Sequence, residues 1–331
     1  MVRCRRGGHA RDPRRQPGPH PRHHHPVRVH TLADGGIAMP LAQLVVSGVL
    51  IGALYSLIAV GLNLVFGVLR VVNFAHGELV MLSMFAAYFL HQWWNIDPFL
   101  SVLITAPAGF LLGALVYVVV LRPIMGKGFF VQVFATLGLS LLLLNGMLYL
   151  VSGTYRTVTT SYTDNTVRIF GTVVSTTRLA AFGVAVVVAL ALWAYLHHTT
   201  WGRAIRATAQ DPAAASTLGI SVDRIYLLTV AVSAAIAAVA GSLLVPIIPI
   251  YPGVGEQLVL VGFVVVVLGG LGSFGGALAG GLLIGVIETV SGYFIGEAVK
   301  QACYFIALII VLLLRPAGLF GTRGAEEFRV A

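Results

Sequence analysis

The sequence predicts an all-α, polytopic integral membrane helical bundle with about 8–10 transmembrane segments, some of them short or broken. Of the 331 residues, 58% are hydrophobic and only 10% are charged, so most of the chain offers no polar face to water. That composition excludes an ordinary soluble domain. Apolar runs of the length that a bilayer core of ~30 Å requires recur from residue 41 to residue 314.

The first 38 residues differ from the rest. They hold eight arginines and two aspartates, and so six of the nine net positive charges. The stretch has no apolar centre for a signal peptide and no aromatic side chain to stack nucleic-acid bases. We predict a disordered tail and no nucleic-acid partner. Because Met39 opens a clean apolar segment, a second interpretation is a mis-assigned start, with translation beginning at Met39.

Nine apolar stretches are candidates for membrane spans. They cover residues 41–66, 79–91, 98–121, 131–151, 179–197, 225–248, 258–268, 277–295 and 301–314. The seventh has only 11 residues. At about 1.5 Å per residue it cannot cross the hydrocarbon, which predicts a short or broken helix.

The distribution of Lys and Arg predicts the orientation. Alternating spans place three basic groups on one side: Arg122 and Lys127; Arg203, Arg206 and Arg224; and Arg315, Arg323 and Arg329. That side is predicted to be cytoplasmic, with residues 322–331 as a cytoplasmic tail. The loop with Arg156, Arg168 and Arg178 falls on the opposite side, against this rule. Counting the spans back from these groups places Met39 outside. A half-crossing in residues 67–77 would reverse the orientation of the first span.

The loop of residues 201–224 predicts a short helix with defined ends. Asp211 is a good N-cap and Pro212 suits the first helical position. Gly219 can adopt the left-handed conformation that ends a helix. A helix this short is not stable alone, so we expect it to dock onto another surface, although a simple surface helix between spans is the alternative.

Polar residues interrupt apolar sequence in GLNLVFGVLRVVNFAHGELVML, residues 61–82. The candidates for a translocation path or a buried polar cluster are Asn63, Asn73, His76 and Glu78. Such groups are costly at membrane depth and usually line a polar cavity or pair with one another. Glu78 is close enough in sequence to His76 and Arg70 for local pairing. A polar turn that anchors two spans is an equally good interpretation.

Residues 262–288 are rich in small side chains. We predict a glycine-rich break at Gly269, Gly270, Gly272, Gly275 and Gly276. Glycines here and at 280, 281 and 285 also let helices approach closely. A glycine-interrupted segment in each half of a chain is typical of a midplane site in transporters, and Glu288 is the acid nearby.

Motifs for nucleotide or metal chemistry are absent from the sequence. It contains no GxxxxGK[ST], no HExxH and no GxSxG, and Cys4 and Cys303 have no metal-ligand spacing. We therefore expect no bound cofactor, no metal site and no enzymatic activity.

These stretches resemble the permease subunits of bacterial branched-chain amino acid ABC importers, the LivH-like branch. The similarity rests on GLNLVFGVLRVVNFAHGELVML, RATAQDPAAASTLGI, VVVVLGGLGSFGGALAGG and LLLRPAGLFG, and it runs from about residue 39 to 321. The resemblance implies a permease domain in residues 39–321 of a bacterial inner-membrane protein. The tail has no counterpart in that family.

The resemblance also implies partners and roles. They are a second related permease, two cytoplasmic ATPase subunits that use ATP, an extracytoplasmic substrate-binding protein and the surrounding membrane lipid. Six residues would form the coupling loop to an ATPase: Arg203, Arg206, Asp211, Pro212, Leu218 and Gly219. Leu, Ile and Val are the implied substrates.

Three alternatives stay open. The permease could carry urea or short amides. A self-sufficient transporter could be driven by protons through His76, Glu78 or Glu288. A membrane-embedded enzyme is the third, although no nucleophile or cofactor cradle is visible.

Overall fold

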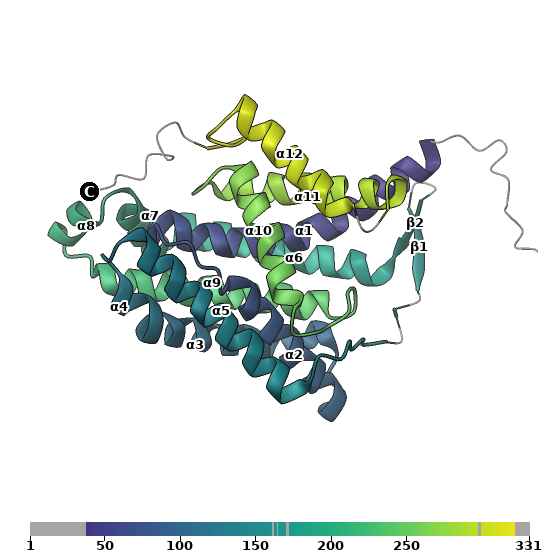
Figure 1. Ribbon diagram of the computed structural model, residues 1–331, viewed down its shortest axis with the longest axis horizontal. Helices are drawn as coiled ribbons and strands as arrows, with labels where there is room; N and C mark the ends of the chain where they lie inside the picture. The colour runs from purple at the N-terminus through teal and green to yellow at the C-terminus, as the bar shows by residue number, and fades with distance from the viewer. Residues whose placement is uncertain (1–37, 161, 164, 170–171, 297–298, 322–331) are drawn as a thin grey trace, which may run out of the picture. The chain divides into compact units, whose positions relative to one another are not determined.

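The computed structural model describes residues 38–160, 162–163, 165–169, 172–296 and 299–321 (Figure 1). The helices in this part of the chain are α1 (Ala38–Leu69), α2 (His76–Trp94), α3 (Pro98–Val116), α4 (Arg122–Ile124), α5 (Phe129–Val151), α6 (Thr176–His198), α7 (Thr200–Gln210), α8 (Pro212–Thr217), α9 (Val222–Leu244), α10 (Val254–Gly269), α11 (Phe274–Phe294) and α12 (Lys300–Leu314). A π-helical turn, Tyr117–Leu121, joins α3 to α4. One antiparallel hairpin pairs β1 (Thr166–Ile169) with β2 (Thr172–Ser175). The predicted tails, residues 1–37 and 322–331, lie outside the described residues.

The predicted fold class is confirmed. Within the described residues, six helices are long and apolar enough to cross a membrane, by length and composition; they lie at residues 41–69, 98–124, 129–151, 176–198, 222–244 and 274–294. The other three predicted spans coincide with α2, α10 and α12. α10 has 16 residues rather than the 11 expected, and α12 has 15. Both remain shorter than the about 20 residues of a full span.

Small residues bring α1 and α11 together along their length. A Cβ on Gly48 would lie 2.6 Å from Val286 Cα, and one on Gly281 would lie 2.7 Å from Ser56 Cα. The Ser56 hydroxyl also donates a hydrogen bond to the Leu278 carbonyl at 2.9 Å. The sequence prediction that Gly281 allows close helix packing is therefore confirmed.

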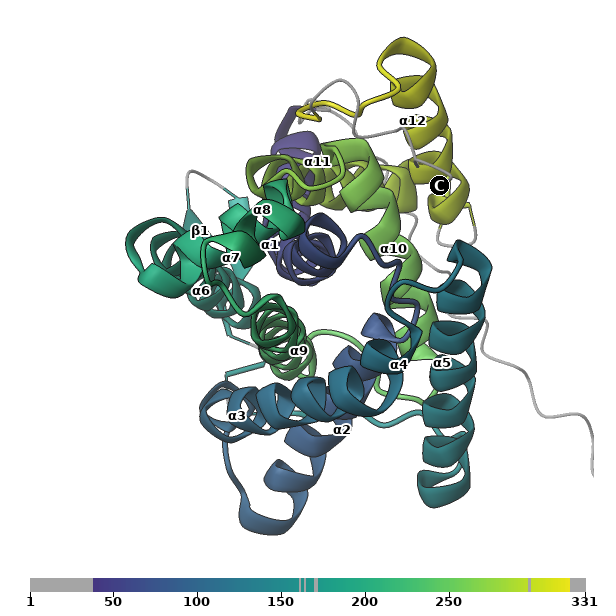
Figure 2. The same cartoon turned by 90° about the vertical axis from the view of Figure 1, so that its left-hand side faces the viewer.

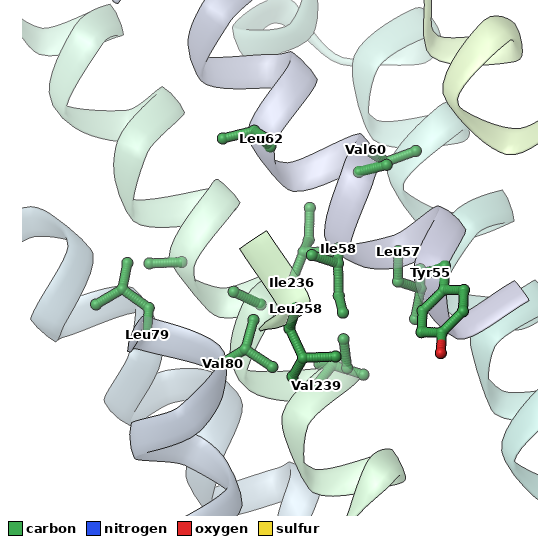
Figure 3. Close-up of a cluster of buried hydrophobic side chains, with 14 of the residues drawn as sticks. Tyr55, Leu57, Ile58, Val60, Leu62, Leu79, Val80, Ile236, Val239 and Leu258 are labelled. Carbon is green, nitrogen blue, oxygen red and sulfur yellow. The ribbon is translucent and has the colours of Figure 1, made fainter. Parts of the chain in front are cut away.

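Helix α9 is the centre of the bundle. Fifteen of its 23 residues are buried, with α1, α2 and α3 packed around it (Figure 2). A Cβ on Gly109 of α3 would meet Ala238 of α9 at 2.6 Å, and the Thr105 and Ser242 hydroxyls bond at 2.7 Å. Figure 3 shows the apolar core where side chains of α1, α2, α9 and α10 interlock.

The basic loops meet at one end of the bundle. Arg122 pairs with Asp223 at the start of α9 at 3.0 Å, which ties the loop after α3 to the loop before α9. The segment after α12 returns to α10, where the Leu319 amide donates to the Leu268 carbonyl at 2.8 Å. The arrangement agrees with the sequence-based orientation, which predicts this end to be cytoplasmic, and it is called the cytoplasmic end below.

The opposite end joins the loops expected outside. Arg156 and Ile250 exchange backbone hydrogen bonds, and the Arg156 guanidinium stacks on Tyr88. The Tyr162 hydroxyl donates to Asp97 at 2.7 Å. Burial and this hydrogen bond raise the pKa of Tyr162 well above its usual value, so the hydroxyl stays protonated. Arg156 thus has a structural role, which accounts for one of the three arginines of this loop that depart from the charge rule.

The chain folds back into the bundle between α1 and α2. Residues 70–75 are not helical, and α2 begins at His76 beside Ile58, near the middle of α1. Backbone of this kind is tolerated at membrane depth only where protein satisfies it. Thr136 of α5 does so, because its hydroxyl donates to the Val72 carbonyl at 3.1 Å. The start of α1 lies beside β2, away from the basic loops, because the Gln43 amide donates to the Val173 carbonyl at 3.3 Å, so the first span is not reversed.

Candidate functional site

At the cytoplasmic end, α7 and α8 form a protruding arm (residues 200–219). The Thr199 hydroxyl caps α7 by accepting from the Gly202 amide at 3.0 Å. α7 is amphipathic: Ile205 is buried, whereas Arg203 and Gln210 on the other side are exposed. The buried side holds the arm to the bundle, and the exposed side is left for a partner or the membrane surface.

Helix α8 has the ends that the sequence predicts. One oxygen of Asp211 accepts from the amides of Ala213 and Ala214, at 2.8 and 3.0 Å, and Pro212 is the first helical residue. At the other end, Gly219 has φ of +81° and bonds back to Ser216. The next amide, of Ile220, donates to the Ala215 carbonyl at 3.1 Å, which completes a Schellman motif.

The predicted coupling residues do not all point the same way. Leu218 is 80% exposed at the tip of the arm, next to Gly219. Arg203 is exposed on α7. The Arg206 guanidinium instead donates to the Leu196 carbonyl and lines a cavity against α1. Leu218 is therefore the most exposed large apolar side chain of the arm, ahead of Trp201 at 49%.

A second candidate region lies where the first turns of α2 and α10 meet. A Cβ on Gly77 would lie 2.7 Å from the Val259 side chain and would overlap the Gly255 carbonyl. The two helices therefore touch through their backbones. Each carries an acid in its first turn, Glu78 on α2 and Glu256 on α10. This contact joins the polar stretch of the first half to the second half of the chain.

The Glu78 carboxyl is held between three helices. It is 1% exposed, its Oε1 accepts from the Ser140 hydroxyl of α5 at 3.2 Å, and its Oε2 has no partner among the described residues. Glu256 is near enough to interact electrostatically and is itself exposed. The sequence analysis missed Glu256 and Ser140; an acid just after the Pro252-Gly253 turn was the signal available for Glu256.

The predicted local pairing of Glu78 with His76 or Arg70 is wrong. His76 is fully buried, and its Nε2 lies 3.1 Å from the Ile58 carbonyl. Arg70 is exposed and has φ of +56°. Residues 76 and 78 leave the first turn of α2 in different directions, toward α1 and toward α5, so the two side chains do not meet. Asn73 accepts from the Ala75 amide at 3.1 Å and so stabilises the turn before α2.

The predicted glycine-rich break coincides with the turn between α10 and α11. Gly270 and Gly272 have positive φ, which only glycine adopts at little cost. Asn63 of α1 holds this turn through both atoms of its amide: it accepts from the Gly272 amide at 2.6 Å and donates to the Ser273 carbonyl at 2.8 Å. Gly269 and Gly276 are in backbone contact across the turn, while Gly275 has open space beside it.

Glu288 lies apart from these groups, on α11. Its Oε1 forms an ion pair with Lys300 of α12 at 3.1 Å, and Tyr55 and Tyr304 lie close to the carboxyl. The sequence analysis did not find Lys300 as its partner. The described residues contain no group of three or more side chains that could hold a metal ion.

The chain matches, over residues 44–314, the family described as "Branched-chain amino acid transport system / permease component". This chain belongs to that family. It is similar to the high-affinity branched-chain amino acid transport system permease protein BraD of Pseudomonas aeruginosa, with 32% identity over 302 residues that cover 86% of this chain and 97% of the relative. The corresponding protein LivH of Escherichia coli is 31% identical over 304 residues, with the same coverage.

A probable LivH of Methanocaldococcus jannaschii is 29% identical over 284 residues, 80% of this chain and 88% of the relative. No solved structure matches the chain significantly. Family membership and the apolar helices make this permease a multi-pass protein of the inner membrane, one component of a transport system. Its role is transport rather than enzymatic catalysis.

Proposed function

We propose that this permease is one of two membrane subunits of an ATP-binding-cassette importer for leucine, isoleucine and valine. The family match and the names of BraD and LivH support the substrate class. Two cytoplasmic ATPases supply the energy, and an extracytoplasmic binding protein delivers the amino acid. The sequence has no phosphate-binding loop of its own, which supports a separate motor.

The observation that carries this proposal is the α7–α8 arm. α8 is held at both ends by its own sequence, and Leu218 projects from it into solvent. A rigid short helix with an apolar tip fits helix-in-groove recognition on an ATPase. Closure of the ATPases on ATP then moves the arm and, through α9 and Arg122, the bundle.

We place the translocation path beside the first turns of α2 and α10. Glu78, Ser140 and Glu256 form a polar group there, between α10 and the loosely packed α5, of whose 23 residues three are buried within the chain. The exposed side of α5 is then available to the second permease. A carboxylate at this depth suits the ammonium group of an amino acid.

Reconstitution tests the proposal. The permease is expressed with the second permease, the two ATPases and the binding protein encoded beside it, and the complex is placed in liposomes loaded with ATP. We expect uptake of radiolabelled leucine that valine and isoleucine compete for and that a proton ionophore leaves unchanged. Uptake by this chain alone, or competition by urea or acetamide instead, would overturn the proposal.

A further inference from the structure

Two adjoining cavities lie between α1, α6, α7 and α11. The first, of about 250 Å³, lies at the cytoplasmic end between α1 and α7, and Asn63, His197 and Arg206 line it. The second, of about 390 Å³, runs along α1, α6 and α11 and is lined by Ala53, Ala189 and Leu282 among others. Phe274 lines both, so the two cavities adjoin at this side chain, and together they offer a polar and an apolar part.

The polar part favours a negative charge. Arg206 contributes a full positive charge, and no Asp or Glu lines either cavity. His197 accompanies it, with its Nδ1 bonded to the Trp193 carbonyl at 2.9 Å, which leaves Nε2 for another partner. In the apolar part the Ser56 hydroxyl is already bonded to the Gly52 and Leu278 carbonyls.

The site lies where the bilayer meets the cytoplasm. Trp193 stacks on His197 with ring centres 4.8 Å apart, an amphipathic pair typical of the membrane interface. The apolar part opens sideways, since Leu190 and Trp193 on its wall are 61% and 44% exposed. An apolar chain could enter from the bilayer while its polar end stays at the level of α7.

We propose that these paired cavities bind one anionic phospholipid, with the phosphate on Arg206 and His197 and an acyl chain in the apolar part between α6 and α11. A basic pocket between transmembrane helices on the cytoplasmic side is a known type of anionic headgroup site. A free phosphate would leave the apolar part unused. The bound lipid would brace α7 against α1, independently of which solute the permease carries.

Native mass spectrometry of the full-length permease, alone and with its partner subunits, tests this. The probes are phosphatidylglycerol and phosphatidylcholine with identical acyl chains, with inorganic phosphate as a competitor. One phosphatidylglycerol should remain bound at energies that remove phosphatidylcholine. Arg206→Gln should reduce that retention about fivefold, the equivalent of one basic contact at a membrane surface. Arg203→Gln on the same helix, outside both cavities, is the matched control and should change it little.

A second pair of variants tests the apolar part. Ala189→Phe fills the groove and should abolish retention of phosphatidylglycerol, whereas Val187→Phe on the exposed side of α6 should not. Equal retention of the two lipids, equal effects of Arg206→Gln and Arg203→Gln, or displacement by inorganic phosphate would overturn the proposal. So would loss of the lipid when the second permease joins, because the groove would then be a protein interface.

Discussion

Gly77 of α2 and Gly255 of α10 are in backbone contact, and this contact joins the two halves of the permease inside the membrane. A methyl group on Gly77 would overlap the Gly255 carbonyl, and one on Gly255 would lie 2.5 Å from Glu78 Oε2. No flexible side chain can move aside to make room on the Gly77 side. The close approach therefore sets where the Glu78 carboxyl sits.

Gly77→Ala should destabilise the permease. Overpacking of this kind costs about 1–3 kcal/mol in unfolding free energy. The measurement is the melting temperature in detergent, followed by size-exclusion chromatography. Gly138→Ala on α5 is the control: nothing lies within 4 Å of its added Cβ, so the helix should be unchanged or slightly more stable. Equal melting temperatures for the two variants would show that α2 and α10 are not in contact.

Local sequence was enough to predict α8 and the glycine-rich break. Both ends of α8 are fixed by residues that directly flank the helix, Asp211 and Gly219, and the turn at Gly270 needs a conformation that only glycine readily takes. The contact between Gly77 and Gly255 was not predictable, because it joins residues far apart in the chain. Lys300 was missed for a different reason: it is near Glu288 in the chain, but the sequence does not show how α12 folds back on α11 to bring the two side chains together.

The α7–α8 arm makes a prediction about coupling. Leu218→Asp should abolish co-purification with the ATPase subunits, because a charge at the exposed apolar tip cannot enter a groove. Asp211→Ala should weaken co-purification by a smaller amount, since loss of an N-cap costs about 1 kcal/mol. Both variants should still insert into the membrane and elute normally. Ser221→Ala, outside α8, is the control; the coupling assignment fails if Leu218→Asp binds the ATPases as wild type does.

Asn63 should be intolerant of apolar replacement. Asn63→Leu would leave the part-buried Gly272 amide and Ser273 carbonyl without their partner, at a cost of about 0.5–1.5 kcal/mol each. Asn63→Asp keeps the acceptor for Gly272 and loses only the donor, so we expect an intermediate melting temperature. A cysteine placed at Ser273 should react faster with a thiol reagent in Asn63→Leu. If both variants melt like wild type, Asn63 does not hold the glycine turn.

The ion pair of Glu288 with Lys300 should couple α11 to α12. A double-mutant cycle with Glu288→Gln and Lys300→Gln should give an interaction free energy of about 1 kcal/mol, since both side chains are only partly exposed. Melting temperatures of the four proteins provide the cycle. If the two substitutions change the free energy of unfolding additively, the ion pair contributes nothing to stability, and Glu288 has another role.

Substitution of Glu78 tests whether its carboxylate is structural or lies on the translocation path. Removal of a structural carboxylate lowers the stability of the fold. Glu78, in contrast, has an oxygen with no partner among the described residues and an acidic neighbour in Glu256. Glu78→Gln keeps the shape of the side chain and removes that electrostatic conflict, so the melting temperature should stay equal or rise. Leucine uptake by the reconstituted complex should fall at least tenfold, the equivalent of about 1.4 kcal/mol, because the ammonium group of the substrate loses its carboxylate partner.

Ser140→Ala is the control. It removes the hydrogen bond to Glu78 and keeps the charge, and should preserve most of the uptake. A drop in melting temperature for Glu78→Gln with uptake per folded protein unchanged would place Glu78 in the scaffold instead.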